Sequence, residues 1–379
     1  MSVSRRLLRA ILPAFLLALA AAAADGPLAI NTESHKELPS NEITALIPEA
    51  DGGMWVCTMA GLARWQDGKL TNEPVLYGGK PAKLGVWDVF RDGDRLWLGH
   101  EQGGSVIADG KQVHQDHLQC AVARYVRMDQ ARLWCVATQG DQRQVQAYED
   151  GVWRQLLLVN GRITALKPAA RKTGDDGELT RPAATGAAGA RIVDLYVAPD
   201  QRVWLTVDGD GVIEVDPAKG LERYTHHLRQ LNVTAVYRDR AGTMWAGLWA
   251  RGVARFDGKD WQMMLENKLK RCAVMRIRED ATGAILAATN ARGVWRLPKG
   301  ATDWTCELED AGSVTLLEVT RDGRVWLGAQ GFGGLKVWDG KAWQVGLASQ
   351  FPVRCLAEDK DGRIWIGGVL DGVHVLPAK

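Results

Sequence analysis

Tryptophan recurs at a nearly constant interval along this chain of 379 residues, which carries 16 tryptophans in all. In one set of eight positions, seven tryptophans and one leucine, successive members are separated by 37 to 42 residues, except for one step of 70 residues. The set comprises Trp55, Trp97, Trp134, Trp204, Trp245, Leu286, Trp326 and Trp365. A period near 40 residues is the length of a β-propeller blade, which buries its core only against its neighbours. The spacing therefore predicts an eight-bladed β-propeller, with seven blades as the alternative.

The fifth copy shows the pattern of one blade most clearly. Val233–Tyr237, Met244–Gly247 and Gly252–Phe256 have the pattern of strands, Asp257–Gly258 forms a hairpin turn, and Trp261–Met264 is the fourth strand. Glycine recurs before the tryptophan and at the start of the third strand, where a turn requires a positive φ. No helical periodicity follows the first 25 residues. The chain is therefore expected to be all-β, with four-stranded antiparallel blades.

The last copy contains only three strands and ends at Gly372–Leu376. Residues 27–34 precede the first blade and have the character of the missing strand. We therefore expect the N-terminal strand to pair with the C-terminal blade and to close the ring. A single domain over 25–379 is expected, with a flexible insertion rich in Ala, Gly and Pro at 167–190. The expected blade cores lie near 41–72, 85–115, 122–158, 191–228, 232–266, 272–308, 313–347 and 352–379.

The first 24 residues have the features of a secretory signal peptide. Arg5, Arg6 and Arg9 accompany the apolar run Leu7–Ala20, and Ala22–Ala24 supplies small residues before a cleavage point. The apolar run is too short for a membrane span, and no later stretch approaches one. We expect a periplasmic or secreted protein without a transmembrane anchor.

Charge is almost balanced in the expected mature chain, where 44 basic and 45 acidic side chains remain once three arginines are removed. Interspersed charges of both signs give no electrostatic reason to bind nucleic acid or anionic lipid. The six cysteines show no metal-binding spacing, and we expect mostly buried thiols rather than a disulfide framework. A monomer is expected.

Catalytic and metal-binding patterns are hard to find in the sequence. The seven histidines are scattered, and His114 and His117 lie near a predicted strand, where residues three apart face opposite sides. No nucleophile elbow, HExxH zinc motif or phosphate-binding loop occurs. We expect a binding protein with no catalytic residues, metal or cofactor. A propeller enzyme, such as a polysaccharide lyase or glycosidase, and a periplasmic assembly scaffold are the alternatives.

The connections between strands divide the ring into two faces. Short turns rich in Asp and Gly follow the first and third strands of each copy and share one face. The connections after the second and fourth strands share the other face, and their residues vary between copies, as is typical of a ligand site on a rigid scaffold. Trp249 lies outside the repeating tryptophan position and is suited to stack on a sugar ring. The candidate ligand-binding residues are Trp249, Arg251, Asn290, Arg292, Gln330, Phe332, Glu101, Asp208, Asp210 and Asp371.

Two stretches, Ile43–Thr58 and Val353–Gly367, resemble the two-component regulator propeller repeat. Each contains an apolar strand, an acidic turn that ends in glycine, and a second strand that begins with an apolar residue and tryptophan. The resemblance implies a periplasmic sensor propeller of the kind often linked to oligosaccharide recognition. It also implies that the partner is an oligosaccharide or a protein, such as a membrane sensor kinase.

Overall fold

The structure is a computed structural model whose described helices and strands are all β-strands, except for one 3-10 turn, η1 (Pro217–Lys219). It describes residues 28–115, 120–127, 133–140, 142–166, 189–221, 223–309, 311–330 and 334–378. The predicted signal peptide, Phe332 and residues 167–188 of the predicted insertion lie outside the described residues. Within the described ranges, no helix has the length and apolar character needed to cross a membrane.

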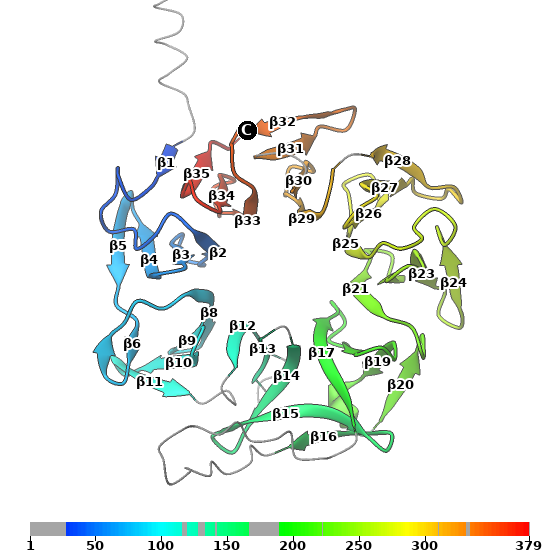
Figure 1. Cartoon of the computed structure of the whole chain (residues 1–379), viewed down its shortest axis with the longest axis horizontal. Coiled ribbons are helices and arrows are strands. Elements are labelled where there is room, and N and C mark those ends of the chain that lie inside the picture. Colours follow the sequence, from blue (N-terminus) through cyan, green and yellow to red (C-terminus); the bar gives the residue numbers. More distant parts are fainter. Residues whose placement is uncertain are drawn as a thin grey trace, which may run out of the picture.

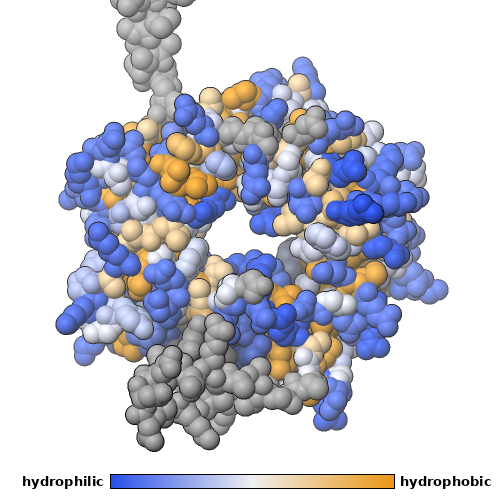
Figure 2. Space-filling view, viewed as in Figure 1, coloured by the Kyte–Doolittle hydropathy of each residue, from blue (hydrophilic) through white to orange (hydrophobic). Residues whose placement is uncertain are grey.

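The strands form a ring of radial sheets around a central opening (Figure 1). Among the described residues, six sheets have four strands each, and a nine-stranded sheet contains two more four-stranded sets. We number these sets as blades 1 to 8 in chain order. The first strand of each blade lies nearest the opening and the fourth lies at the rim. The opening persists when the atoms are drawn at full size (Figure 2). The predicted all-β propeller is confirmed, and the strand sets are consistent with eight blades.

Within the described ranges, blades 3 and 4 depart from the plan of independent four-stranded sheets. Strand β15 of blade 3 pairs with β17 of blade 4, and the extra strand β16 (Arg162–Leu166) also pairs with β15. The strand sets of blades 1 to 4 are β2 (Ile43–Pro48), β3 (Met54–Thr58), β4 (Gly61–Gln66) and β5 (Lys69–Glu73); β8 (Val86–Asp92), β9 (Arg95–His100), β10 (Gly103–Ala108) and β11 (Lys111–Gln115); β12 (Ala121–Arg127), β13 (Leu133–Gln139), β14 (Gln142–Glu149) and β15 (Val152–Val159); and β17 (Ala190–Val197), β18 (Val203–Val207), β19 (Val212–Val215) and β20 (Tyr224–His227). A small hairpin, β6 (Leu76–Tyr77) and β7 (Lys80–Pro81), lies between blades 1 and 2 in the chain.

Blades 5 to 8 repeat one plan with little variation. Their strands are β21 (Val233–Arg238), β22 (Met244–Leu248), β23 (Val253–Phe256) and β24 (Trp261–Met264); β25 (Val274–Glu279), β26 (Ile285–Thr289), β27 (Val294–Leu297) and β28 (Thr305–Leu308); β29 (Val314–Val319), β30 (Val325–Ala329), β31 (Leu335–Trp338) and β32 (Trp343–Leu347); and β33 (Val353–Glu358), β34 (Ile364–Gly368), β35 (Val373–Leu376) and β1 (Leu28–Ile30). Because consecutive strands are antiparallel, the two classes of connection lie on opposite faces, as predicted. We call them the turn face, after the first and third strands, and the loop face.

The two ends of the chain meet in blade 8. Strand β1 pairs antiparallel with β35, with Leu28 opposite Val375 and Ile30 opposite Val373. Ile30 is completely buried in the core that blade 8 shares with blade 1. The predicted closure of the ring by pairing of the termini is therefore confirmed.

The repeating tryptophans pack between neighbouring blades. Trp55 of blade 1 belongs to the same buried cluster as Val86 of blade 2, and Trp365 of blade 8 belongs to the same cluster as Leu46 of blade 1. Eight such clusters occur among the described residues, and each is shared by two adjacent blades. A large aromatic area is thus buried at most blade junctions, which holds the ring rigid.

Candidate functional site

A repeated backbone hydrogen bond fixes the loop face. The residue that follows the second strand of a blade donates its N–H to the carbonyl of a residue at or just before the start of the first strand. The bond measures 2.9 Å from Asp208, 2.9 Å from Trp249, 3.1 Å from Asn290 and 2.9 Å from Gln330. Four of the predicted site residues therefore stand on a backbone that the ring holds in place, which limits the entropy lost when a ligand binds.

Ala273 brings two of the predicted residues together from different blades. Trp249 forms an isolated antiparallel bridge with Ala273, and the side-chain Oδ1 of Asn290 accepts the N–H of Ala273 at 2.9 Å. Trp249 is 49% exposed, whereas the other tryptophans of the described ring are buried or half-buried. Trp249 and Asn290 therefore flank the same residue at the junction of blades 5 and 6.

Two arginines complete this cluster. Nε of Arg251 pairs with Oε1 of Glu266 at 2.8 Å, and both side chains are exposed. Arg292 is exposed in the same connection as Asn290, where its backbone N–H donates to Oγ1 of Thr289 at 2.7 Å. We call Trp249, Arg251, Asn290 and Arg292 the loop-face patch.

The other predicted residues lie on other blades of the loop face and have local roles. Asp208 pairs with Arg191 at 2.5 Å, and Oδ1 of Asp210 accepts the N–H of Gln230 at 2.8 Å. Glu101 on blade 2 and Gln330 on blade 7 are exposed. The structure thus brings four of the predicted residues together, leaves five elsewhere around the ring, and does not describe Phe332.

Asp371 on blade 8 is the most constrained of the predicted residues. Its Oδ2 accepts the hydroxyl of Ser349 at 2.6 Å and lies 3.2 Å from Nε2 of His374. Burial alone would raise the pKa of Asp371, but the hydrogen bonds from His374 and Ser349 outweigh it and leave the pKa lowered. Asp371 is therefore an ionised carboxylate that organises its own loop.

A pocket of about 350 Å³ lies on the turn face, between the inner ends of blades 5, 6 and 7. None of the nine described residues that the sequence nominated lines it. The sequence indicated only structural turns there, so this hollow was missed. Its volume is at the lower end of the range for small-molecule sites.

Radial antiparallel blades around a central opening define this structure as a β-propeller. Within that class, the family described as a two component regulator propeller matches residues 346–369, which span the start of blade 8. The chain therefore carries the two-component regulator propeller repeat, as its sequence predicted.

Two of the solved structures that resemble this chain support the fold. The computationally designed Ika8 protein is 15% identical, with a TM-score of 0.58 over 90% of this chain and 98% of that one. The Dos1 propeller is 10% identical, with a TM-score of 0.55 over 89% and 92% of the two chains. The extracellular domain of BT3049 from B. thetaiotaomicron, described as a hybrid two component system, is 14% identical, with a TM-score of 0.48 over 92% of this chain and 53% of that one. The chain thus spans about half the length of that domain, and no curated protein matches it.

Proposed function

We propose that this chain is an exported, non-catalytic recognition domain that binds a small polar ligand through the loop-face patch and reports it to a protein partner. The two-component regulator propeller repeat at 346–369 supports a sensor role. The observation that carries the proposal is the half-exposed indole of Trp249, held next to Asn290 by the backbone of Ala273. A carbohydrate is the ligand class that suits this arrangement, and a membrane sensor kinase is the partner that the repeat suggests.

The chemistry of the patch favours a ligand rich in hydroxyl groups. An exposed indole offers a flat apolar face against the carbon skeleton of a sugar ring. Because Oδ1 of Asn290 already accepts a backbone N–H, its amide NH₂ is the group that can donate to a ligand. Glu266 balances the charge of Arg251, so Arg292 is the arginine of the patch that is best placed to donate to a ligand hydroxyl.

A glycan array probed with the purified mature protein tests this function, followed by thermal melting with each saccharide that binds. We expect a saccharide to raise the melting temperature, because a ligand of the folded state stabilises it. Trp249→Ala should weaken binding about ten-fold or more through the loss of the stacking surface.

Tyr77→Ala is the matched control, because Tyr77 is another exposed aromatic residue, at 44%, but lies on the β6–β7 hairpin. It should bind the saccharide as the parent protein does. Binding that survives Trp249→Ala would contradict the loop-face site. Turnover of a bound saccharide would favour the alternative of a lyase or glycosidase, and capture of a protein without any saccharide would favour an assembly scaffold.

A further inference from the structure

An arginine–glutamate clamp ties the turn of blade 5 to blade 6. The backbone N–H of Arg240 donates to Oε2 of Glu279 at 2.7 Å, and Nε of Arg240 lies 3.1 Å from the same oxygen. The Arg240 guanidinium also donates to the backbone carbonyl of Asp280. One blade thus supplies a cation and a backbone N–H, and the next supplies a carboxylate and a carbonyl.

The same clamp ties blade 7 to blade 8. The backbone N–H of Arg321 donates to Oε2 of Glu358 at 2.7 Å, and Nε of Arg321 lies 2.9 Å from Oε1. The guanidinium of Arg321 donates to the carbonyl of Asp359. The positions are equivalent in the repeat, because each arginine stands two residues before the turn glycine and each glutamate stands at the end of a first strand.

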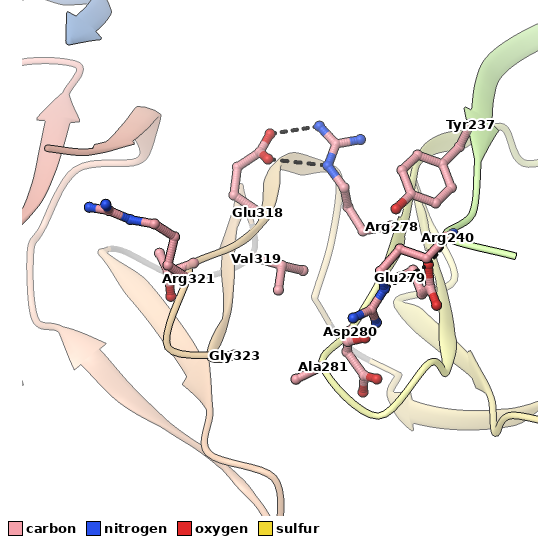
Figure 3. Close-up of a pocket in the computed structure, with 11 residues that line it drawn as sticks. Tyr237, Arg240, Arg278, Glu279, Asp280, Ala281, Glu318, Val319, Arg321 and Gly323 are labelled. Atoms are coloured by element: carbon pink, nitrogen blue, oxygen red, sulfur yellow. Dashed lines mark hydrogen bonds and ion pairs between the residues drawn. The ribbon is translucent and has the colours of Figure 1, made fainter. Parts of the chain in front are cut away.

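Both members of the clamp are replaced at the junction of blades 6 and 7. Ala281 occupies the arginine position of blade 6, and Val319 occupies the glutamate position of blade 7. The turn-face pocket of about 350 Å³ lies at this place, and both residues line it (Figure 3). The pocket is therefore the space that a clamp fills at the neighbouring junctions.

The double replacement also leaves two backbone groups without the partners that the clamp provides. Among the described residues, the N–H of Ala281 has no acceptor, where the equivalent N–H of Arg240 has a carboxylate. The carbonyl of Thr320 accepts the N–H of Gly323 at 2.8 Å but receives no guanidinium. Ala281 and Thr320 both line the pocket, from opposite blades, so a donor and an acceptor are available there for a ligand.

The charges that line the pocket cancel. Three arginines and three carboxylates surround it, and one pair spans blades 6 and 7, with Nη2 of Arg278 2.7 Å from Oε1 of Glu318 and Nε 3.1 Å from Oε2. Figure 3 shows this pair at one edge of the pocket, beside Tyr237. A neutral lining does not favour a ligand with a net charge, so the missing clamp is best matched by a ligand that carries both charges itself.

We propose that this pocket binds the zwitterionic head of a free α-amino acid. The ligand carboxylate takes the place of the clamp glutamate and accepts the N–H of Ala281. The ligand ammonium takes the place of the clamp arginine and donates to the carbonyl of Thr320. The ligand side chain lies against Val319, next to the Arg278–Glu318 pair. This site is independent of the loop-face patch.

Melting curves of the mature protein with each of the common free L-amino acids, taken one at a time, test the proposal. We expect at least one to raise the melting temperature by about 3 °C or more at saturation. The double variant Ala281→Arg/Val319→Glu should fold, because it copies the clamps of the neighbouring junctions, and should lose this rise. Ala281→Pro replaces the N–H with a ring carbon, at a turn position that proline favours, and should weaken binding at least ten-fold.

Ala281→Ser is the matched control, because it keeps the N–H and a small side chain and should bind as the parent does. Trp249→Ala should also retain the rise, which separates this site from the loop-face patch. The proposal is overturned if no amino acid shifts the melting temperature, or if the shift survives both Ala281→Pro and the double variant. A saccharide whose shift is lost in those variants would overturn the ligand class.

Discussion

The indole N–H of Trp365 donates to Oδ2 of Asp359, six residues earlier in the same blade, over 2.8 Å. The same bond joins Trp245 to Asp239 in blade 5, also over 2.8 Å, and blade 7 uses the hydroxyl of Thr320 in place of the carboxylate. A tryptophan in the core between blades is thus anchored to a polar side chain in the turn. This bond couples the order of the turn face to the packing of the ring.

Removal of the Asp359 carboxylate should destabilise the protein, because four donors converge on it. Oδ1 accepts the N–H groups of Asp361 and Arg363, and Oδ2 accepts the indole and Nε of Arg363. Asp359→Ala should lower the free energy of unfolding by about 2 to 3 kcal/mol, measured by urea denaturation. Asp359→Thr should recover part of the loss, because blade 7 makes the tryptophan bond with threonine. Equal losses of unfolding free energy in the two variants would show that the hydrogen bond from the indole does not stabilise the protein.

The contribution of Asp359 to the free energy of unfolding should depend on pH. Burial alone would raise its pKa, but the hydrogen bonds from Trp365 and Arg363 outweigh burial and leave the pKa below its usual value. The charged form is therefore favoured by folding, so the stabilisation is present above the unfolded-state pKa, near 4, and is lost as pH falls through the folded-state pKa. The difference between the parent and Asp359→Ala should shrink as the pH is lowered from 5 to about 2.

Asp88 should show the opposite pH dependence. Burial raises the pKa of Asp88 from its ordinary 3.8 to about 6, although the N–H of Tyr125, 2.6 Å away, and the charge of Arg124 work against the rise. The folded state holds this proton more tightly than the unfolded state, so Asp88 costs stability as pH rises from about 4 to about 6. Asp88→Asn should therefore be more stable than the parent at pH 7, by about 3 kcal/mol, and equal to it near pH 4.

Thermal melts of the parent and Asp88→Asn at a series of pH values check this prediction, since all other groups are shared. The asparagine Oδ1 can still accept the N–H of Tyr125, so the hydrogen bond is kept. A difference that stays constant between pH 4 and pH 7 would show that the carboxyl does not titrate in that window.

Ring closure should carry a measurable part of the stability. Ile30 is the last residue of β1, is fully buried, and packs in the core shared by blades 8 and 1. Ile30→Ala should lower the free energy of unfolding by about 2 to 4 kcal/mol through the cavity that it leaves. Leu28→Ala, at a position that is 46% exposed in the same strand, should cost less than about 1 kcal/mol. Similar losses at both positions would mean that β1 does not dock as the structure shows.

The sequence was sufficient for the architecture because each blade repeats its own signals. A tryptophan in the second strand, glycines at the turns and a missing final strand were enough to predict the ring and its closure. The joining of blades 3 and 4 could not be predicted, because it depends on Leu157 and Leu158 of β15 pairing with Arg191 and Ala190, which are distant in the chain. No local pattern encodes such a pairing.

The sites could be predicted only in part. Variation between copies indicated the loop face, but only the structure shows that Asn290 and Trp249 meet at Ala273. The pocket had a signal in the sequence, since Ala281 and Val319 both differ from the clamp residues of the two neighbouring junctions. The two differences cannot be interpreted until the structure shows that the positions lie at the same blade junction. Turn residues are also ordinarily assigned a structural role.

Blade 6 lacks the repeating tryptophan, and a different donor satisfies its turn carboxylate. Leu286 stands at the tryptophan position, and the guanidinium of Arg296 donates to Oδ2 of Asp280, whose side chain is 3% exposed. Arg296→Met should lower the free energy of unfolding by about 3 kcal/mol or more, because it leaves a buried carboxylate without its cation. Chemical denaturation measures the loss.

A second substitution separates the charge from the packing at this position. Asp280→Asn in the Arg296→Met background removes the unpaired charge while keeping an oxygen that can accept the N–H groups of Thr282 and Ala284. It should therefore recover stability, whereas the same change in the parent should lower it. The remaining deficit reports the contact of Arg296 with the ring of Trp338, whose centre lies 5.5 Å from the guanidinium carbon. If Asp280→Asn is equally harmful in both backgrounds, the two side chains are not coupled, and the arginine does not replace the indole.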